Sequence, residues 1–403
     1  MTDVLLLTHR IPWPPDKGDK IRSYNILCHL AEKFRLHLGT FVDSAEDWQY
    51  VSQLEARCQS VCVRPAGRLR TAIRGLSALR HGAPVTVAYY DDRRLSEWVS
   101  DVAKRHSLDA ALVFSAGMAR HVKALPAATR KVLDMVDVDS EKWHEYARLK
   151  GWPRSWIYER EAQLLSKVEV ELVSRFDRTL LVSQQEAGLL KKRCPQYSNR
   201  VGVMANGVDA DYFSPATGHA NPYPGDVEAI VFTGAMDYWA NIEGVQWFAS
   251  SVFPLIRQQA PRARFYVVGS RPTREVRGLE NTPGVVVTGR VPDVRPFLAH
   301  ARLAVAPLRV ARGLQNKVLE AMAMARPVVA TTAAMLGIDY RGPGVRTADT
   351  AGEFSQAVLQ HLSATEFLAN RRFVVEHFSW AAALAQLDQA LLGENENSEV
   401  EIV

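Results

Sequence analysis

The sequence predicts an α/β protein built from two Rossmann-like, doubly wound domains, and three observations lead to this prediction. The chain has 403 residues, of which 47% are hydrophobic, so it can bury two cores in domains of about 200 residues each. Short apolar runs alternate with amphipathic stretches, which is the pattern of parallel sheets covered by helices. This pattern occurs in both halves. We therefore expect two such domains facing each other across a cleft at the carboxyl ends of their strands.

Each predicted strand is a short run rich in leucine or β-branched residues. The helix pattern is clearest at 318–324 and 380–392. The predicted strands are 4–7, 36–41, 110–114, 131–136 and 179–182 in the first half, and 229–233, 264–268, 285–288, 303–306 and 327–330 in the second.

A segment rich in proline and glycine divides the halves. Residues 214–226 contain three prolines, two glycines and almost no large apolar residue, which is typical of a linker. We predict a first domain at 1–213 and a second at 227–378. The helix at 379–392 is expected to return to the first domain, and 393–403 to form an acidic, flexible tail.

Composition excludes several classes of protein. The 49 Lys and Arg against 44 Asp and Glu leave a charge of +5, which is too small for a dedicated nucleic-acid binder. The four cysteines are too few and too scattered for a disulfide framework, which favours a reducing compartment. The apolar run 4–7 is too short for a signal peptide. No run of about 18 apolar residues could cross a bilayer, so we predict a cytoplasmic protein.

The loop after the first predicted strand has features of an anion site. Gly18 permits a close backbone approach, a helix is expected to start near residues 19–21, and Lys20 and Arg22 add positive charge. Backbone amides at a helix start favour an anion. An ordinary strand-to-helix turn explains the same residues equally well.

A pair of aspartates follows the predicted strand 131–136. Asp137 and Asp139 form a D-x-D, which holds a divalent metal in one large class of sugar transferases, and Trp143 follows on the next predicted helix. Helix capping gives the same pattern, and the spacing recurs at Asp209 and Asp211. We therefore expect no metal, and treat Asp137, Asp139 and Trp143 as candidate acceptor contacts, with capping as the alternative.

Residues 64–80, RPAGRLRTAIRGLSALR, combine five arginines with apolar residues and contain no acid, and GWPRSW adds Trp152 and Trp156. Such a basic amphipathic surface can lie on an anionic membrane. A solvated helix packed on the first domain is the alternative. The sequence thus allows a peripheral position at the inner face of the membrane.

The segment 307–332, PLRVARGLQNKVLEAMAMARPVVATT, carries the strongest chemical signal. A predicted strand leads into a loop with Arg309 and Arg312, and Lys317 and Glu320 stand three residues apart on one helical face. Cations at a helix N-terminus suit a diphosphate, and a carboxylate one turn further can accept hydrogen bonds from ribose hydroxyls. A solvated Lys–Glu pair on an amphipathic helix is the simpler alternative.

Residues 317–332 resemble the signature of the retaining glycosyltransferases of family 4, which have the two-domain GT-B fold and use nucleotide-sugar donors. Further similar segments follow in that family's order: NGVD at 206–209, FTGAMDYWANIEGVQWF at 232–248, VTGRVPDVRPFLAHARLAVAPL at 287–308 and HFSW at 377–380. PPDKGDKIRSYN at 14–25 and VDVDSEKW at 136–143 most resemble the sugar transferases associated with PEP-CTERM/exosortase polysaccharide loci. The resemblance covers nearly the whole chain.

Two departures from the family pattern concern the donor site. The family motif has two glutamates separated by seven residues, but the first position holds Arg312, and the usual Arg and Lys after Gly234 are replaced by Ala235, Met236, Asp237 and Tyr238. Arg309, Arg312 and Lys317 can replace that lost positive charge.

The resemblance implies transfer of a sugar from a nucleoside diphosphate to a glycan or lipid-linked acceptor with retention, as in polysaccharide biosynthesis, with the acceptor on the first domain and the nucleotide sugar on the second. We expect no metal or other cofactor, because neither D-x-D has supporting ligands and the cationic loop can neutralise the diphosphate. The small net charge predicts no nucleic-acid partner. A nucleotide-sugar epimerase or hydrolase on the same fold, or a non-catalytic sugar-binding protein, is the alternative. The expected catalytic residues are Lys317, Arg312 and Glu320, the donor contacts are Gly18, Arg309, Asn316, Gly234, Asp237 and Arg290, and the acceptor contacts are Lys20, Asp137, Asp139 and Trp143.

Overall fold

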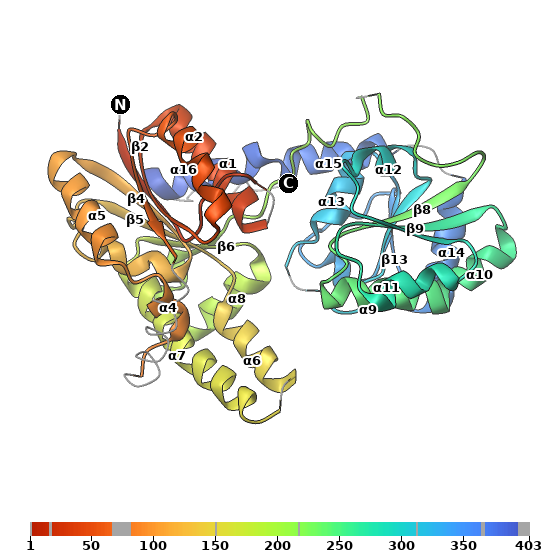
Figure 1. The fold of residues 1–403 in the computed structure, drawn as a ribbon, viewed down its shortest axis with the longest axis horizontal. Coiled ribbons are helices and arrows are strands. Elements are labelled where there is room, and N and C mark those ends of the chain that lie inside the picture. The colour runs from red at the N-terminus through yellow and green to blue at the C-terminus, as the bar shows by residue number, and fades with distance from the viewer. Residues whose placement is uncertain are drawn as a thin grey trace, which may run out of the picture. The chain divides into compact units, whose positions relative to one another are not determined.

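The computed structural model describes residues 2–15, 18–66, 82–149, 151–216, 218–311, 313–363 and 367–393. The chain divides into two compact units (Figure 1). Unit 1 comprises Met1–Ala205 together with the chain from Leu384 onward, and unit 2 comprises Asn206–Ala383. Both are layered α/β structures, so the predicted fold class of two Rossmann-like domains is confirmed. None of the described helices is both long and apolar enough to span a bilayer.

Unit 1 contains a parallel sheet in the order β3-β2-β1-β4-β5-β6-β7. Its strands are β1 (Asp3–Thr8), β2 (Arg35–Val42), β3 (Ser60–Pro65), β4 (Leu108–Phe114), β5 (Arg130–Val136), β6 (Arg178–Leu181) and β7 (Val201–Val203). All six residues of β1, DVLLLT, are buried, as expected for a strand covered on both faces. The strand order reverses between β1 and β4, where doubly wound folds bind ligands.

Helices connect these strands, with three-residue-per-turn helices at Ala45–Tyr50, Ala116–Val122 and Pro195–Arg200. The helices are α1 (Gly18–Lys33), α2 (Val51–Glu55), α4 (Val85–Tyr89), α5 (Arg93–Arg105), α6 (Asp139–Leu149), α7 (Arg154–Arg175) and α8 (Gln184–Arg193). Helices α6 and α7 pack against each other as a hairpin at the lower end of unit 1 in Figure 1.

Helix α1 is fixed to the sheet through a buried ion pair. Arg22 is 1% exposed and donates from Nε and Nη2 to the two carboxylate oxygens of Asp134 on β5, at 2.8 and 2.9 Å. Its Nη2 also donates to the carbonyl of Met204 at 2.8 Å. The Arg22 charge, expected to face an anion, is thus used to hold α1 in place.

Unit 2 contains a six-stranded parallel sheet in the order β10-β9-β8-β11-β12-β13, which reverses between β8 and β11. Its core includes Phe248 and Phe265, whose ring centroids are 4.4 Å apart. The strands are β8 (Glu228–Thr233), β9 (Ala263–Val268), β10 (Val285–Gly289), β11 (Leu303–Ala306), β12 (Val328–Ala330) and β13 (Val345–Thr347). The helices are α9 (Trp239–Trp247), continued by a π-helical turn at Phe248–Val252, α10 (Phe253–Gln259), α11 (Arg274–Arg277), α12 (Arg295–His300), α13 (Asn316–Ala323), α14 (Ala351–Leu362) and α15 (Leu368–Phe378), with short three-residue-per-turn helices at Gly278–Asn281 and Ala333–Met335.

The boundaries between the units differ from those expected. The segment 214–226 belongs to unit 2, where Tyr223 is buried and its hydroxyl donates to the carbonyl of Phe297 at 2.6 Å. The prolines and glycines of this segment are typical of a linker, but the buried ring of Tyr223 fixes the segment to unit 2. The last helix, α16 (Trp380–Leu392), joins unit 1 from Leu384 onward and lies beside α1 (Figure 1), where Asp388 contacts His29 at 2.8 Å.

Candidate functional site

The strongest candidate site lies in unit 2, at the carboxyl ends of β8 and β11, where the strand order reverses. Strand β8 leads through Gly234–Tyr238 into α9, and β11 leads through 307–315 into α13. Gln315, the residue before α13, forms no side-chain capping hydrogen bond. In the first turn of α13 the amide of Val318 donates to the carbonyl of Gln315 at 3.0 Å, and a helix N-terminus of this kind favours an anion.

Lys317 is the central cation of this site. Its Nζ donates to Asn241 Oδ1 at 2.6 Å and lies 4.7 Å from the centre of the Phe232 ring. Asn241 is 5% exposed and is itself held by a hydrogen bond from its Nδ2 to the carbonyl of Ala235, at 2.8 Å. The ammonium group is thus positioned near the carboxyl end of β8 by Asn241 on α9, which the loop after β8 holds in place.

The environment shifts the acidity of both charged groups on α13. Desolvation lowers the pKa of Lys317 to about 8, against the opposing charge of Glu320. Desolvation likewise raises the pKa of Glu320 to about 7, against the charge of Lys317. Both groups therefore change protonation state close to neutral pH, as groups at functional sites often do.

The loop after β8 has no room for a side chain at Gly234. A Cβ atom there would lie 2.8 Å from Asn241 Nδ2, and one on Gly269 would lie 1.7 Å from the carbonyl oxygen of Gly234. The two glycines at the ends of β8 and β9 therefore let the backbones approach closely. This packing holds Asn241, and through it Lys317, in place.

Two other predicted donor contacts lie close to α13. Asn316, its first residue, has a buried Oδ1 that has no hydrogen-bond partner in the described structure, so a donor group from a ligand would satisfy it. Arg309 is half-exposed, and its guanidinium pairs with Glu243 on α9, with Nε at 2.6 Å from the carboxylate. A diphosphate would have to share Arg309 with Glu243.

The remaining predicted donor contacts in unit 2 are more exposed. Asp237 pairs with Arg271, with carboxylate oxygen and Nε 2.7 Å apart. Arg290 is exposed directly after β10, at the same edge of the sheet but two strands from β8. Arg312 lies outside the described residues.

The corresponding edge of unit 1 carries a group that the sequence analysis missed. His9 follows β1 directly, its Nε2 lies 3.4 Å from Asp19 on α1, and its Nδ1 is buried without a partner among the described residues. Its ring stacks on Phe114 at the end of β4, with centroids 5.4 Å apart. Only the position of His9 directly after a strand in the sequence could have indicated it.

Asp19 is a stable anion beside that histidine. Desolvation raises its pKa, but the hydrogen bond from His9 and the charge of Arg10 outweigh this effect and bring it to about 2. Gly18, at the start of α1, is exposed, and a Cβ there would meet no atom within 4 Å. Lys20 is buried, and its Nζ donates to Asp47 at 3.0 Å, so it already neutralises a carboxylate.

The predicted acceptor contacts fall into two groups. Asp137 and Asp139 both accept hydrogen bonds from Lys142 Nζ, at 2.7 and 3.0 Å, and their charges raise the pKa of Lys142 despite its desolvation. Trp143, in contrast, lines a pocket of about 340 Å³ whose walls are mainly apolar. The pocket is lined by Val85, Thr86, Tyr89, Tyr90, Trp143, Ile157, Tyr158 and Glu161.

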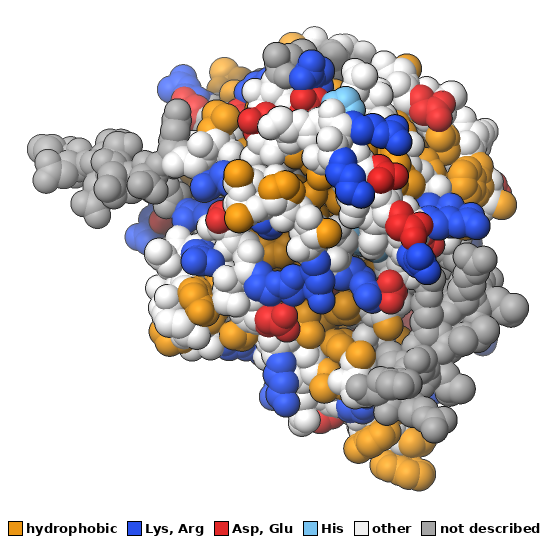
Figure 2. All heavy atoms as spheres, turned by 90° about the vertical axis from the view of Figure 1, so that its left-hand side faces the viewer, with side chains coloured by type: hydrophobic (Ala, Val, Ile, Leu, Met, Phe, Trp, Pro, Cys, Tyr) orange, Lys and Arg blue, Asp and Glu red, His pale blue; other side chains and the backbone are white. Residues whose placement is uncertain are grey.

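The end of the α6–α7 hairpin exposes large aromatic side chains. Trp152 is 84% exposed and Trp156 is 61% exposed. Figure 2 shows hydrophobic side chains gathered at its lower margin, the level at which this hairpin ends in Figure 1. Of the predicted basic helix at 64–80, residues 67–80 lie outside the described residues.

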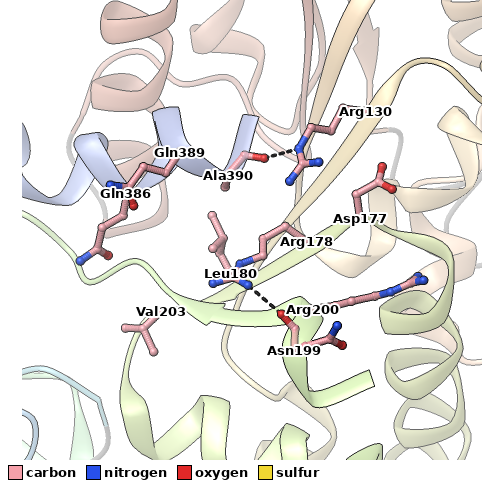
Figure 3. A pocket seen from close by; sticks show the side chains of 10 residues that line it. All are labelled: Arg130, Asp177, Arg178, Leu180, Asn199, Arg200, Val203, Gln386, Gln389 and Ala390. Atoms are coloured by element: carbon pink, nitrogen blue, oxygen red, sulfur yellow. Dashed lines mark hydrogen bonds between the residues drawn. The ribbon is translucent and has the colours of Figure 1, made fainter. Parts of the chain in front are cut away.

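A polar pocket of about 260 Å³ lies at the other edge of the unit 1 sheet, near the starts of β5, β6 and β7 (Figure 3). Its arginines bind main-chain carbonyls: Arg130 donates to Ala390 on α16 at 2.6 Å, and Arg178 to Asn199 at 2.7 Å. These contacts fix α16 and the segment before β7. This pocket is distant along the strands from the edge where the predicted unit 1 residues lie.

Comparison with known protein families gives a match to part of unit 2. Residues 228–364 match the family model described as "Glycosyl transferases group 1". No curated protein matches the chain in sequence.

Solved structures resemble the chain over its whole length. A glycosyltransferase from Rickettsia africae ESF-5 is 12% identical, with a TM-score of 0.65, and the alignment covers 98% of this chain and 99% of that one. HepE of Anabaena in complex with UDP and glucose is 15% identical, with a TM-score of 0.60 and coverage of 97% and 100%. Sucrose-phosphate synthase from Thermosynechococcus elongatus is 13% identical, with a TM-score of 0.61 and coverage of 98% and 99%. The fold is GT-B.

Proposed function

We propose that the chain is a glycosyltransferase that moves a sugar from a nucleoside diphosphate to a carbohydrate or lipid-linked acceptor with retention, in polysaccharide biosynthesis. The observation that carries this proposal is the desolvated Lys317 at the N-terminus of α13, held by Asn241 at the strand reversal of unit 2. The match of residues 228–364 to group 1 glycosyltransferases supports it. Retention and the polysaccharide role rest on the resemblance to family 4 and to the exosortase-associated transferases.

In the proposed reaction, an acceptor hydroxyl attacks the anomeric carbon while the bond to the diphosphate breaks, and the departing phosphate oxygen takes the hydroxyl proton. The difficulty is the charge that develops on the diphosphate. Lys317 and the first-turn amides of α13 are fixed before the reaction and stabilise that charge, with Arg309 and Arg312 as further cations. Glu320 accepts hydrogen bonds from the ribose, and the unpaired Oδ1 of Asn316 accepts one from the donor.

The first test is a thermal-shift screen of nucleoside diphosphates and their sugars, followed by detection of product with the sugar that stabilises best. Binding of a nucleoside diphosphate by the intact chain is expected, because the site contains a partly buried cation and a helix N-terminus. A non-catalytic sugar-binding protein would bind free sugar but no nucleoside diphosphate, so that result would contradict the proposal.

Hydrolysis of the nucleotide sugar is a second candidate function, favoured by His9. This imidazole is oriented by Asp19 and has a buried, unpartnered Nδ1 that could accept a proton from water. Release of free sugar without an acceptor, lost in His9→Ala, would indicate a hydrolase. A transferase would release free sugar only slowly without an acceptor. It would form a glycoside instead when an acceptor is added.

Sugar transfer is expected to persist in EDTA. Asp137 and Asp139 are both paired with Lys142, and Lys317 and the helix terminus can neutralise the diphosphate without a metal. Transfer is measured after dialysis against EDTA and after adding Mg²⁺ or Mn²⁺. Complete loss that manganese restores would overturn the assignment.

Nucleoside diphosphate affinity is expected to be highest between pH 7 and pH 8. It should rise as Glu320 loses its proton near pH 7 and fall as Lys317 loses its proton near pH 8, with apparent values that belong to the pair. Titration calorimetry from pH 6 to pH 9.5 measures both limbs.

Two variants show which residue causes each limb of the pH profile. Lys317→Arg keeps its charge throughout this range and should lack the alkaline limb. Glu320→Gln should lack the acidic limb, apart from the titration of the phosphate itself near pH 6. An alkaline limb unchanged in Lys317→Arg would show that another group causes it.

We also propose that the α6–α7 end of unit 1 binds an anionic membrane from the cytoplasmic side. Vesicles that contain phosphatidylglycerol should co-sediment the protein, less so in high salt. Trp152→Ser with Trp156→Ser should weaken binding by about 100-fold or more, because each buried aromatic contributes roughly 1.5–3 kcal/mol. Trp48→Ser is the control, since Trp48 is 44% exposed elsewhere in unit 1. Equal binding to neutral vesicles, or in all variants, would contradict the proposal.

A further inference from the structure

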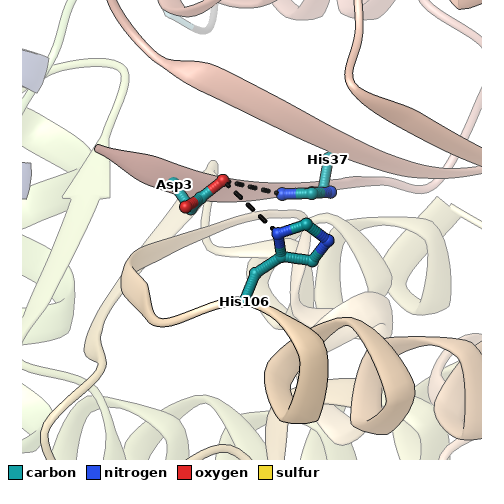
Figure 4. Close-up of side chains that lie close together, drawn as sticks. All are labelled: Asp3, His37 and His106. Carbon is teal, nitrogen blue, oxygen red and sulfur yellow. Dashed lines mark hydrogen bonds and ion pairs between the residues drawn. The ribbon is translucent and has the colours of Figure 1, made fainter. Parts of the chain in front are cut away.

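Asp3, His37 and His106 meet at the amino-terminal edge of the unit 1 sheet (Figure 4). Asp3 begins β1, His37 lies near the start of β2, and His106 directly follows α5, two residues before β4 begins. Asp3 is 4% exposed and His37 is fully buried, while the His106 side chain is 34% exposed. Three segments far apart in the sequence thus bring two imidazoles and one carboxylate together.

The three ligand atoms of this cluster lie within 4.8 Å of one another, close enough to share a metal ion. One carboxylate oxygen of Asp3, Oδ1, lies 3.2 Å from His37 Nε2 and 3.9 Å from His106 Nδ1. The first distance is at the upper limit of an N–H···O hydrogen bond and the second exceeds it. Ligand atoms about 2.0–2.1 Å from a tetrahedral Zn²⁺ are about 3.3 Å apart, so the Asp3–His37 distance matches. A small rotation of the partly exposed His106 ring would shorten the distance from Asp3 to His106 to a similar value.

The surrounding contacts are those that orient metal ligands. The other ring nitrogen of His37, Nδ1, lies 2.8 Å from Ser60 Oγ, to which it can donate, leaving Nε2 free of a proton for a metal. Arg35 donates to both carboxylate oxygens of Asp3, from Nη2 to Oδ2 at 2.5 Å and from Nε to Oδ1 at 3.0 Å. Both ligands would therefore be held in orientation by neighbours on β2 and β3.

We propose that Asp3, His37 and His106 bind a divalent transition-metal ion, with Zn²⁺ as the ion that this nitrogen and oxygen set favours. The three groups leave a fourth position for water. The site lies at the opposite edge of the sheet from the loops after β1 and β4. The ion therefore joins β1, β2 and the start of β4 and stabilises unit 1, and it takes no part in sugar transfer.

The test uses the full chain, freed of metal by EDTA and transferred to chelator-free buffer. Calorimetry with ZnCl₂ should show one saturable site, and zinc should raise the melting temperature. His106→Ala should weaken zinc binding by more than about 100-fold, because it removes a ligand rather than a supporting group. Asp3→Asn should do the same. His144→Ala is the matched control, since His144 lies 2.9 Å from the Glu159 carboxylate but belongs to no such three-ligand group in the described structure.

Cobalt substitution separates this site from the four free cysteines. Co²⁺ bound by Asp3, His37 and His106 should give visible d–d absorption without a thiolate charge-transfer band, and the absorption should be lost in His106→Ala. Circular dichroism verifies that each variant is folded, and His106→Gln replaces any variant that is not. The proposal is overturned by the absence of saturable zinc binding, by unchanged affinity in the folded His106 variant, or by a thiolate band.

Discussion

Lys317→Ala is expected to lower kcat/KM for sugar transfer by about 100-fold or more, since removing one positioned group that stabilises developing charge typically costs about 2.7–4 kcal/mol. The ammonium is fixed by Asn241 at 2.6 Å and lies against the Phe232 ring, so no reorganisation is needed when the diphosphate departs. Lys317 is also the only lysine between residues 206 and 383. Steady-state kinetics with the nucleotide sugar selected by the binding screen measure the effect.

Two comparisons make this experiment specific. Arg262→Ala removes an exposed cation at the start of β9, the opposite edge of the same sheet, where Arg262 contacts Asp226 and Glu228; transfer should be unchanged. Melting temperatures should show that Lys317→Ala remains folded, because the variant removes a desolvated charge as well as a hydrogen bond. A folded Lys317→Ala enzyme within about threefold of the original kcat/KM would contradict the assigned role, given the magnitude above.

Arg22→Ala is expected to reduce the free energy of unfolding of unit 1 by about 3–5 kcal/mol, because removing one partner of a buried ion pair leaves the other charge uncompensated. Asp134 is 0% exposed and would keep its charge inside the sheet without the two hydrogen bonds from Arg22. The Met204 carbonyl would also lose a donor. Denaturant unfolding followed by hydrogen exchange on β5 resolves the unit 1 transition in this two-unit chain.

The double variant Arg22→Met with Asp134→Leu is the informative companion, because replacing a buried ion pair by apolar residues of similar volume is often neutral. It should recover most of the lost stability. Arg175→Ala is the surface control: Arg175 pairs with Glu171 on one turn of α7 at 3.1 Å, and its loss should cost under about 1 kcal/mol. A cost this small for Arg22→Ala would show that the pair does not hold α1.

All ten strands predicted from the sequence are present, but three further strands were missed. Strands fully buried between helices, such as β1, have continuous apolar runs that periodicity detects. Strand β3, SVCVRP, contains a charged residue and is only partly buried, and β7 and β13 have three residues each. Runs this short fall below the length that a pattern can distinguish from a loop, and they are formed through pairing with a neighbouring strand.

The sequence predicts a candidate site residue where a short motif contains it. It does not predict which distant residues contact that side chain in the fold. Lys317 and Glu320 could be proposed from the sequence because they stand three residues apart near a helix start, but the contact of Lys317 with Asn241 joins residues 76 positions apart. Lys20 and Arg22 looked like a basic loop, whereas burial beside Asp47 and Asp134 makes them internal ion pairs. Charge alone does not indicate whether water or a carboxylate faces a side chain.

The path of the last helix limits how the two units of such a chain can be recombined in evolution. Unit 2 is one continuous segment, whereas unit 1 is completed by α16, whose Asp388 reaches Lys33 at 2.6 Å and whose Ala390 carbonyl binds Arg130. A single genetic crossover near residue 206 would therefore join a native α1 to a foreign α16, with mismatched contacts between them. Replacing unit 2 while keeping unit 1 whole needs two junctions, near 206 and 383, so recombination between relatives has to transfer this segment as an internal cassette.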